Sequence, residues 1–556
     1  RILYGVMNEM PGVWCERVFA PWGDMEALMR EEHIPLWALE SGDPLADFDM
    51  IAFSVGYEMS YTNILNMLDL AGIPLRASER TGLKNMVFAG GTCMYNPEPL
   101  AAFLDLCILG EGEEINGEVI ALYDKAKREG WDKPRFLRQA AQIPGVYVPA
   151  LYQFTWNDDG TIAAIEPLDG APGVVTKRIV SDLDRAPFPT SPIVPSTEIV
   201  HDRASLELFR GCIRGCRFCQ AGFVYRPIRA KSAETLVRQG TELLENTGYS
   251  EITLASLSTS DYRQLPEFAD KMLDYCNPRS ISLSLPSLRA DNFSRELMEK
   301  VQSVRKSGLT FAPEAGTQRL RDAINKNVTE DEILSTCATA FSGGWSNVKL
   351  YFMLGLPTET DEDVLGIAEL ANKVLHTWYE NRPPKSRGVN ITVSTAYFIP
   401  KPFTPFQWEA QITPEEYDRR VKLLRGAITS RKIQYHWHET ELSVLEAALA
   451  RGDRKLCAVL ERAVKNGVKL DAWREYFRND VWLEAFDACG VDPAFYAFRE
   501  RGKDEIFPWD AISVGVRREF FEKEREQAYA SVCSPDCRHQ CAACGARALN
   551  GGKCDE

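Results

Sequence analysis

Three cysteines lie within eight residues of one another in the segment GCIRGCRFCQAG (211–222). Cys212, Cys216 and Cys219 have the spacing C-x3-C-x2-C, and Gly211 and Gly215 bound the first part of their loop. Iron–sulfur centres are ordinarily held by four cysteines, so three thiolates would leave one iron open. Structural zinc would need a fourth protein ligand, and the next three residues supply none. The spacing favours a metal centre with an open position for a substrate or cofactor over packing or disulfide cysteines.

A second group of cysteines stands near the end of the chain, in SVCSPDCRHQCAACG (531–545). Its spacing is C-x3-C-x3-C-x2-C, over Cys533, Cys537, Cys541 and Cys544, with His539 and Cys554 nearby. Four thiols so close together predict a closed metal site, and disulfides are the weaker alternative in a chain without a secretion signal. Zinc and a second iron–sulfur cluster both accept four thiolates, so both remain open here.

Alternating strand and helix patterns follow from residue 205 and must position the first cysteine group. Strand-like apolar runs stand at 206–209, 251–257, 281–285, 309–312, 348–354 and 391–397, separated by helical stretches. Six such βα units predict a partial (β/α)6 barrel over 203–410, with its chemistry in the loops that follow the strands. The loops so nominated are the cysteine loop, 258–261, 286–289, 313–316 and 355–357.

The cysteine spacing on the first loop of a six-fold βα barrel resembles the radical S-adenosylmethionine (SAM) superfamily. The resemblance implies that Cys212, Cys216 and Cys219 hold a 4Fe-4S cluster whose open iron takes SAM. Reduction by a one-electron donor such as flavodoxin or ferredoxin then cleaves SAM to a 5′-deoxyadenosyl radical. The aromatic residue before the third cysteine, Phe218, is expected near the adenine.

Other strand ends carry further likeness to the superfamily. The fourth-strand segment LTFAPEAG resembles that of barrel relatives that modify tRNA, and VKLYFMLGLPTET resembles a fifth-strand element. These matches nominate Glu314, Gly316, Gly355 and Pro357 as SAM contacts. Relatives bind the SAM amino group at the second strand end with a Gly-Gly-Glu triplet; here ASLSTSD replaces it and nominates Ser258, Ser260 and Asp261. Arg289 and Arg319 could pair with the SAM carboxylate, and surface ion pairing is the alternative for each.

The first 140 residues also alternate strand and helix signals, at 47–54, 84–91 and 105–114. The pattern predicts a doubly wound parallel sheet, and it resembles the cobalamin-binding domains that precede many radical SAM barrels. Ser54, Gly90 and Gly91 stand where those domains have their cofactor loops; the alternative is the same fold without the cofactor. Because the chain begins at Arg1, in an apparent helix, we expect some N-terminal sequence to be missing.

The remaining segments connect or extend these domains. An Asp-Gly turn between alternating residues and several prolines predict a hairpin and linker at 141–202. Residues 411–530 read as a mainly helical domain and 531–556 as a cysteine-rich metal-binding tail. Within the helical region, YHWHETE places His436 and His438 on one face of a strand. A polar surface and a substrate or proton-transfer role are both open for these histidines.

Composition bounds the choice of partner and compartment. The 556 residues carry a net charge of −15, which disfavours a broad nucleic-acid-binding surface. A local basic patch around the first cysteines keeps RNA open: Arg210, Arg214, Arg217, Arg226, Arg229 and Lys231. We expect no membrane span and no signal peptide, and therefore a cytoplasmic protein, from the absence of the required apolar runs.

The sequence as a whole resembles a family of radical SAM proteins with a cobalamin-type domain and a cysteine-rich tail. The resemblance implies an enzyme that abstracts hydrogen from its substrate, with cobalamin-dependent methyl transfer as a further step. One alternative is a radical SAM enzyme that modifies tRNA, rRNA or the ribosome. Another is a regulatory protein that binds cobalamin and SAM without turnover.

Overall fold

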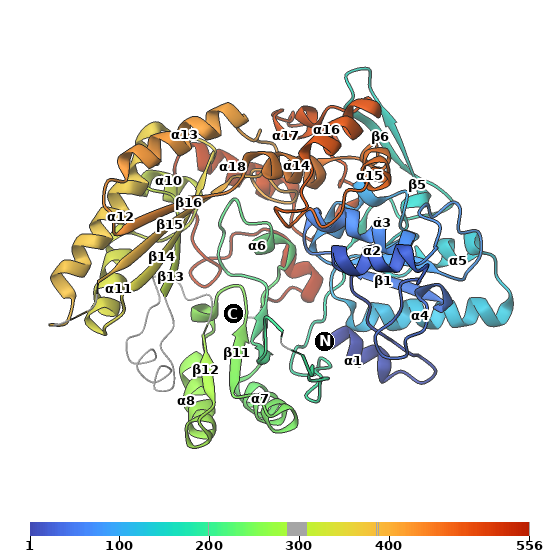
Figure 1. Ribbon diagram of the computed structural model, residues 1–556, viewed down its shortest axis with the longest axis horizontal. Coiled ribbons are helices and arrows are strands. Elements are labelled where there is room, and N and C mark those ends of the chain that lie inside the picture. The colour runs from blue at the N-terminus through green and yellow to red at the C-terminus, as the bar shows by residue number, and fades with distance from the viewer. Residues whose placement is uncertain (198, 286–308, 385, 387, 555–556) are drawn as a thin grey trace. The chain divides into compact units, whose positions relative to one another are not determined.

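The computed structural model describes residues 1–197, 199–285, 309–384, 386 and 388–554. The chain forms two compact units, each built from two separate stretches (Figure 1). The first unit comprises Arg1–Val180 and Val444–Gly515, and the second comprises Ser181–Ser443 and Val516–Glu556. The loop expected at 286–289, with Arg289, lies outside the described residues.

The first unit is built on a four-stranded sheet of order β1-β2-β3-β4. β1 (Met50–Ser54), β2 (Met86–Gly90) and β3 (Leu106–Ile108) are parallel, and β4 (Val146–Tyr147) pairs antiparallel with β3. The near-continuous apolar runs of β2 and β3 are buried, as expected of parallel strands covered on both faces. β5 (Tyr152–Trp156) and β6 (Ile162–Pro167) form the expected hairpin, and β7 (Val175–Thr176) pairs with β17 (Ile512–Ser513).

Helices complete the first unit and come from both of its stretches. The first stretch supplies α1 (Ile2–Asn8), α2 (Gly23–Glu31), α3 (Tyr61–Leu70), α4 (Gly112–Glu129) and α5 (Lys133–Ala140); the second supplies α15 (Leu456–Lys465), α16 (Asn479–Ala488) and α17 (Pro493–Ala497). α14 (Thr440–Arg451) crosses from one unit into the other. α15 packs against α3 and against a 3₁₀ turn at Glu98–Leu100, and the apolar face of α15 is buried there.

The second unit contains two parallel sheets. One has the order β12-β11-β8, with β8 (Ala204–Glu207), β11 (Glu251–Ala255) and β12 (Ser282–Ser284). The other has the order β13-β14-β15-β16, with β13 (Leu309–Glu314), β14 (Asn347–Leu354), β15 (Asn390–Tyr397) and β16 (Ile433–Trp437). Each of the six expected strands has a counterpart, and β16 is a parallel strand that the helical interpretation of 411–530 did not include. The α/β fold class is confirmed.

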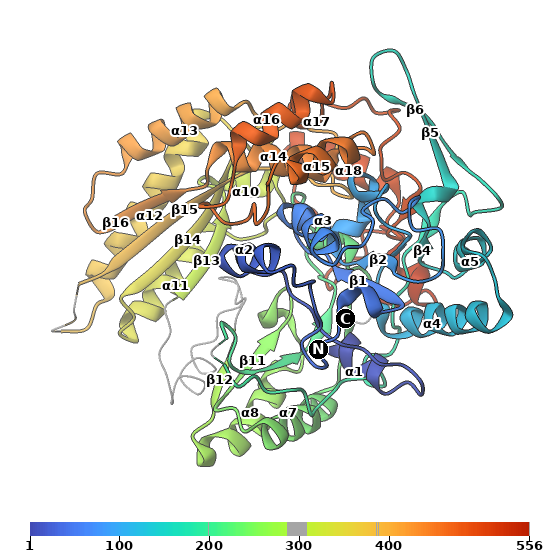
Figure 2. The same ribbon diagram turned by 45° about the vertical axis from the view of Figure 1, so that its right-hand side comes forward.

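The helices of the second unit are α6 (Ala221–Val224), α7 (Ala233–Thr247), α8 (Leu265–Cys276), α10 (Gln318–Ala323), α11 (Glu330–Ser342), α12 (Asp361–Asn381), α13 (Pro414–Ala427) and α18 (Arg518–Tyr529). Of these, α7, α10, α11, α12 and α13 begin after a Ser or Thr whose side chain caps the first turn. Thr360 and Asp363 form a capping box at the start of α12, and Thr329 and Glu332 form one at α11. In Figure 2, α11, α12 and α13 lie along the β13–β16 sheet, and α12 contacts β14 and β15.

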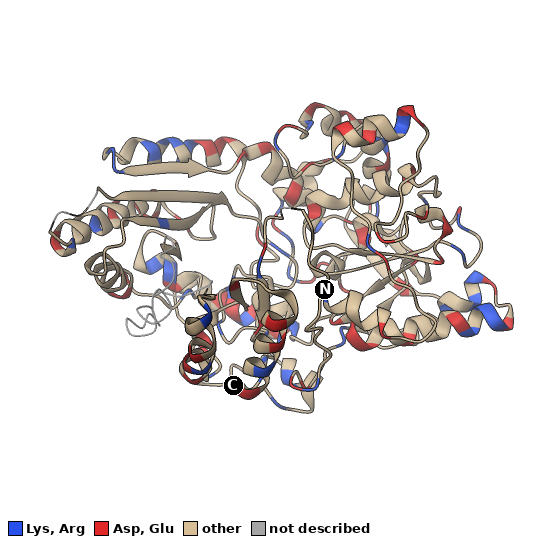
Figure 3. Cartoon of the chain, turned by 60° about the horizontal axis from the view of Figure 1, so that its bottom comes forward, with Lys and Arg blue, Asp and Glu red and all other residues tan. Residues whose placement is uncertain are grey.

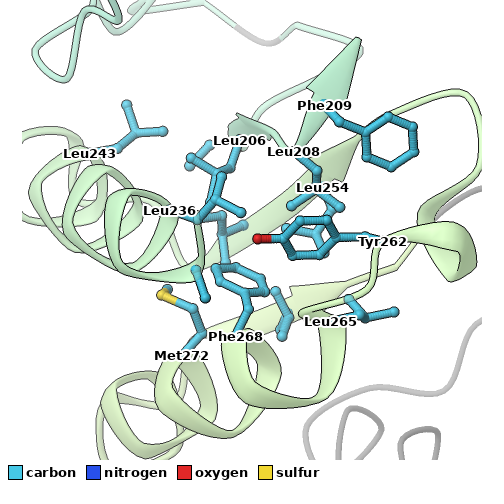
Figure 4. Packing of buried hydrophobic residues seen from close by; sticks show 14 of the residues in the cluster. Leu206, Leu208, Phe209, Leu236, Leu243, Leu254, Tyr262, Leu265, Phe268 and Met272 are labelled. Carbon is cyan, nitrogen blue, oxygen red and sulfur yellow. The ribbon is translucent and has the colours of Figure 1, made fainter. Parts of the chain in front are cut away.

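The core beneath the cysteine loop fixes the first strands of the second unit. Leu206 of β8 and Leu254 of β11 are buried with Leu236 of α7 and Phe268 and Met272 of α8 (Figure 4). A short antiparallel pair, β9 (Phe209–Arg210) with β10 (Arg229–Ala230), then closes the base of the loop that carries the first cysteines. The loop therefore projects from a rigid strand end.

Residues 411–530, which were expected to form one helical domain, are instead divided between the two units. Residues up to 443 continue the second unit, 444–515 belong to the first, and 516–556 return to the second. The reason is packing: the buried face of α15 rests on α3, whereas α18 contacts α10. None of the described helices combines the length and the apolar character needed to cross a membrane.

Candidate active site

The first cysteine group lies in the loop between β9 and α6, at the carboxyl end of the first barrel strand. The Cys212, Cys216 and Cys219 thiols are free and their residues are partly buried. The pKa of Cys212 is raised to about 11 and that of Cys219 to about 12, mainly by burial and then by the neighbouring Cys216 thiol. Thiols that repel one another as anions in this way lie close together, and bound metal would stabilise their thiolates. The donor set and its burial fit an iron–sulfur cluster.

The placement of the candidate ligand side chains bears on the kind of metal centre that they could hold. Among the described residues, no group of three Cys, His, Asp or Glu side chains is placed so that it could hold a single metal ion. A 4Fe-4S cluster offers each cysteine a different iron, so its ligands need not converge on one point.

The basic residues around this loop are inside the protein. Arg217 and Arg229 are 0% exposed, and Lys231, Arg226 and Arg214 are 2%, 4% and 8% exposed. Arg210, the sixth residue of the expected basic patch, is partly buried, so the structure does not present these residues as a solvent-facing basic surface and the RNA alternative gains no support from them. Figure 3 shows Lys and Arg interspersed with Asp and Glu along the helices of the chain.

The loop after β11 lies beside the cysteine loop, and its carboxylate is already bound. Ser258 is buried and donates to Asp261 Oδ2 at 2.7 Å, and Ser260 is partly buried in the same 3₁₀ turn. Asp261 also accepts from Arg214 Nε at 2.9 Å and from Arg538 Nη2 at 2.8 Å. The structure thus gives Asp261 a role in joining segments, and its expected contact with the SAM amino group stays a prediction.

Phe218 and Glu314 meet a lysine that the sequence interpretation missed. Phe218 packs against a cluster that includes Ala315, and Lys326 Nζ lies 5.9 Å from the centroid of its ring. Lys326 Nζ is also 3.1 Å from Glu314 Oε1, at the irregular end of β13, where Glu314 has φ +69°. The site therefore combines an aromatic wall with an ammonium and a carboxylate.

A sequence signal for Lys326 was present. Asn325 and Asn327 flank it and both adopt the left-handed conformation, with φ of +52° and +51°. Asparagine tolerates that conformation better than most residues, so Asn-Lys-Asn is a plausible sign of a tight turn that presents its central side chain.

The glycines of the fourth and fifth strand ends are explained by the protein's own packing. A Cβ at Gly316 would collide with the α12 backbone at Asp363 and Ile367. Gly355 has φ +93°, and its Cβ would come within 2.9 Å of Ile412. Pro357 follows in the same loop and is partly buried. Their expected contacts with SAM stay predictions.

Glu359 supports the loop that contains Gly355. Its Oε2 accepts the Gly355 N–H at 2.7 Å, and its side chain forms an ion pair with Arg420. The pKa of Glu359 is raised to about 7, because burial raises it by more than Arg420 and the Gly355 N–H lower it.

The expected cobalamin loops of the first unit follow β1 and β2. Ser54 is exposed at the end of β1, and Gly90 is partly buried at the end of β2. A Cβ at Gly91 would lie 2.5 Å from Val55 O, and a Cβ at Gly110 would collide with the Arg178 backbone. Gly91 and Gly110 thus allow close approach of the chain to itself, and the expected cofactor role of Ser54, Gly90 and Gly91 stays a prediction.

The tail cysteines divide into two places. Cys533 Sγ lies 3.9 Å from Asp322 O, near the end of α10. The pKa of Cys554 is raised to about 11, mainly by burial and then by the nearby Cys537, Cys544 and Cys541 thiols. Cys554 is thus brought to three of the expected ligands, whereas Cys533 stands at the α10 end.

His436 and His438 are exposed at β16 and just beyond its end. The His438 N–H donates to Thr395 O at 3.1 Å, and Tyr417 Oη donates to His438 O at 3.2 Å. These contacts hold the backbone of the segment. The structure places neither histidine with the cysteine loop.

Comparison with known proteins places this site in a family. Residues 206–371 match the family model described as "Radical SAM superfamily", and residues 1–149 match "Radical SAM proteins, N-terminal". An uncharacterized protein of Methanocaldococcus jannaschii is 28% identical over 470 residues, which cover 83% of this chain and 91% of that protein. The predicted resemblance to radical SAM proteins is confirmed.

Two further similarities are more distant. A threonylcarbamoyladenosine tRNA methylthiotransferase of Bacillus subtilis is 22% identical over 216 residues, 36% of this chain and 44% of that protein. The solved structure of the radical SAM methyltransferase TsrM from Kitasatospora setae, with cobalamin and a [4Fe-4S] cluster bound, has 12% identity and a TM-score of 0.41. That match covers 67% of this chain and 64% of TsrM.

Proposed function

We propose that this chain, which belongs to the radical SAM superfamily, is an enzyme that holds a 4Fe-4S cluster through Cys212, Cys216 and Cys219. The observation that carries the proposal is the group of three neighbouring, partly buried free thiols at the carboxyl end of the first barrel strand. When bound, the cluster supplies the electron that cleaves SAM to a 5′-deoxyadenosyl radical, which abstracts hydrogen from the substrate.

The chain's own residues bind and orient SAM. Phe218, with the buried cluster behind it, offers an apolar wall for the adenine and excludes water. Lys326 and Glu314 offer charges of both signs, as the carboxylate and amino groups of SAM require. Ser258, Ser260 and Asp261 are proposed as the second side of the amino-group site. A one-electron donor such as flavodoxin or ferredoxin is the expected partner.

Anaerobic reconstitution with iron and sulfide tests the proposal. We expect bound iron and, with SAM and a strong reductant, 5′-deoxyadenosine. Replacing any one of the three cysteines with alanine should remove about four irons per chain and the product. Reductive SAM cleavage that persists in any of these variants would show that the assignment is wrong.

The tail is proposed to hold a second metal. Cys537, Cys541 and Cys544 are proposed as three of the ligands, and the fourth is either Cys533 or Cys554. Comparing the metal content of Cys533→Ala and Cys554→Ala identifies the fourth ligand. About four irons per reconstituted chain, together with zinc, would indicate a zinc tail; about eight irons would indicate a second cluster. The free thiols of the chain favour a reducing compartment, so we propose that the protein acts in the cytoplasm.

Cobalamin-dependent methyl transfer is a separate candidate, prompted by the parallel sheet that precedes the barrel. Because Gly91 and Gly110 are filled by the protein's own backbone, we derive no step through cobalamin. S-adenosylhomocysteine formation that depends on added methylcobalamin would support this candidate, and cobalamin binding without any turnover would favour the regulatory alternative.

RNA modification is the remaining alternative, prompted by the fourth-strand motif, and the tRNA-modifying relatives cover 36–45% of this chain. The burial of the loop arginines removes the basic patch that favoured it. Salt-dependent binding of tRNA or rRNA would restore it.

A further inference from the structure

The arginines between the first cysteines reach toward the C-terminal segment of the chain. Arg214 and Arg217 alternate with the cysteines in sequence, yet 8% and 0% of their surfaces are exposed. Burying a guanidinium is costly unless carboxylates or carbonyls receive its N–H groups. The residues that receive them therefore show what these arginines do.

Arg217 joins the cysteine loop to α10, α18 and the tail. Its backbone N–H donates to Ile324 O at 3.0 Å, and its Nη1 donates to Ala323 O at 2.8 Å. Its Nε donates to Glu524 Oε2 of α18 at 3.0 Å, and its Nη2 donates to Val532 O at 2.8 Å. A side chain located between Cys216 and Cys219 is thus fixed by segments that are more than 300 residues away in sequence.

Glu524 in turn binds the tail beyond Val532. Ser534 Oγ donates to Glu524 Oε1 at 2.8 Å, and the Ser534 N–H donates to Asn325 Oδ1 at 2.8 Å. Asn325 Nδ2 donates to Gly215 O, within the cysteine loop, at 3.0 Å. The tail and the loop therefore share two bridges, one through Glu524 and one through Asn325.

A second set of contacts holds the other half of the loop. Arg214 donates to Asp261 and lies 3.4 Å from Asp536 Oδ2 of the tail. Arg538 of the tail reaches the same Asp261, with 2.8 Å to Oδ1 and 2.9 Å to the backbone O. The Cys537 N–H donates to Ile213 O at 3.1 Å. Two arginines and two aspartates thus alternate across the boundary between loop and tail.

We infer that residues 516–538 act as a clamp that holds the first cysteine loop in the shape its thiolates need, with Arg214 and Arg217 as positioning residues. The inference rests on the proposed cluster site and adds that the barrel loop alone does not define it. Arg214 and Arg217 hold the tail, and neither is free to bind RNA.

Arg538→Ala in the full chain is the most direct test, because Arg538 is partly exposed and its loss should leave the fold intact. Arg547→Ala is the matched control, since Arg547 is exposed in the same tail. Arg538→Lys keeps the charge and should rescue part of the effect. Asp536→Asn removes the other tail charge at this boundary and replaces Arg538→Ala should that variant not fold.

Hydrogen exchange of cluster-free protein gives the first readout. We expect amides of residues 211–220 to exchange about tenfold faster in Arg538→Ala than in the parent chain and in Arg547→Ala. After reconstitution, the electron paramagnetic resonance spectrum of the reduced cluster should change in g-values or broaden in the same variant, with partial recovery in Arg538→Lys. A general loss of stability would instead speed amide exchange throughout the second unit and would not by itself change the g-values of the cluster.

Unchanged exchange at 211–220 in both Arg538→Ala and Asp536→Asn would overturn the clamp, whatever the metal content. Failure of the parent chain to bind iron would overturn the proposed function instead, and the exchange comparison would still decide the clamp.

Discussion

At the scale of single residues, Lys326 is the charged group that most directly tests the SAM site. Its ammonium lies beside Phe218, Glu314 and the cysteine loop. We expect Lys326→Met, which keeps the aliphatic stem, to raise the KM for SAM about tenfold or more by removing one charged hydrogen bond. The iron content should be unchanged.

Lys373→Met is the control for this change, because Lys373 forms an exposed ion pair with Glu330 on the helices behind the sheet. Equal KM values for the parent chain and the Lys326 variant would place Lys326 outside the SAM site.

Glu359 makes the stability of the second unit depend on pH. Burial raises the pKa of this carboxyl to about 7 from the ordinary 4.5, so the folded protein binds more protons than the unfolded chain between these values. Its contribution to stability is therefore present at low pH and is lost as pH rises through about 7. Glu359→Gln removes this loss, and its amide oxygen can still accept the Gly355 N–H.

We expect the difference in Tm between Glu359→Gln and the parent chain to become more favourable to the variant from pH 5 to pH 8. The corresponding free-energy change is on the order of 1–3 kcal/mol. Glu362→Gln, at an exposed position in the first turn of the following helix α12, should show no such trend. A difference in Tm that stays constant with pH would mean that the carboxyl is not protonated in the fold.

At the scale of elements, Gly316 sets how closely the β13 loop approaches α12. Since an added Cβ would meet the α12 backbone, neither side can give way cheaply. We expect Gly316→Ala to cost about 2–4 kcal/mol, as overpacked core positions do. Thermal unfolding measures the loss.

For Gly426→Ala, on α13, we expect a gain in stability rather than a loss. Nothing lies within 4 Å of its added Cβ, so the greater helix propensity of alanine should stabilise by up to about 1 kcal/mol. A Gly316 variant as stable as the parent chain would return that glycine to the SAM-contact role expected from the sequence.

The strands of the barrel could be predicted because their apolar periodicity is local, and the three-cysteine loop because its spacing is contiguous. The roles of Gly316 and Asp261 could not, since each depends on atoms brought in from distant segments. Arg217 illustrates the reason. It bonds the Glu524 side chain of α18 and the Val532 carbonyl of the tail. Contacts of this kind produce no periodic pattern in the sequence, so they cannot be predicted from it. Local patterns thus located the cysteine loop, whereas the ion pairs that hold it join residues far apart in sequence.

At the scale of the whole molecule, residues 444–515 leave the unit that contains the barrel and fold with the first unit. Arg454 forms an ion pair with the buried Glu98 at 2.7 Å, and Thr62 Oγ1 donates to Asp471 Oδ2 at 2.6 Å. Asn96 Nδ2 donates to Ala450 O and Gly452 O at 3.0 and 2.9 Å. The domain boundary that the sequence suggested at residue 203 therefore cuts through one folded unit.

A fragment that begins at residue 203 should consequently be unstable in its middle. Without α3, the buried side chains Leu456, Val459 and Leu460 of α15 would face water, at about 1.5–3 kcal/mol each. We expect this fragment to aggregate on size exclusion, and its residues 456–465 to exchange amide hydrogens freely, whereas the full chain protects them. The barrel strands and α18 keep their partners in the fragment, so its residues 206–209 and 518–529 should remain protected. Slow exchange throughout 444–515 in a monomeric fragment would mean that these helices fold without the first unit, and the chain would then divide in sequence order.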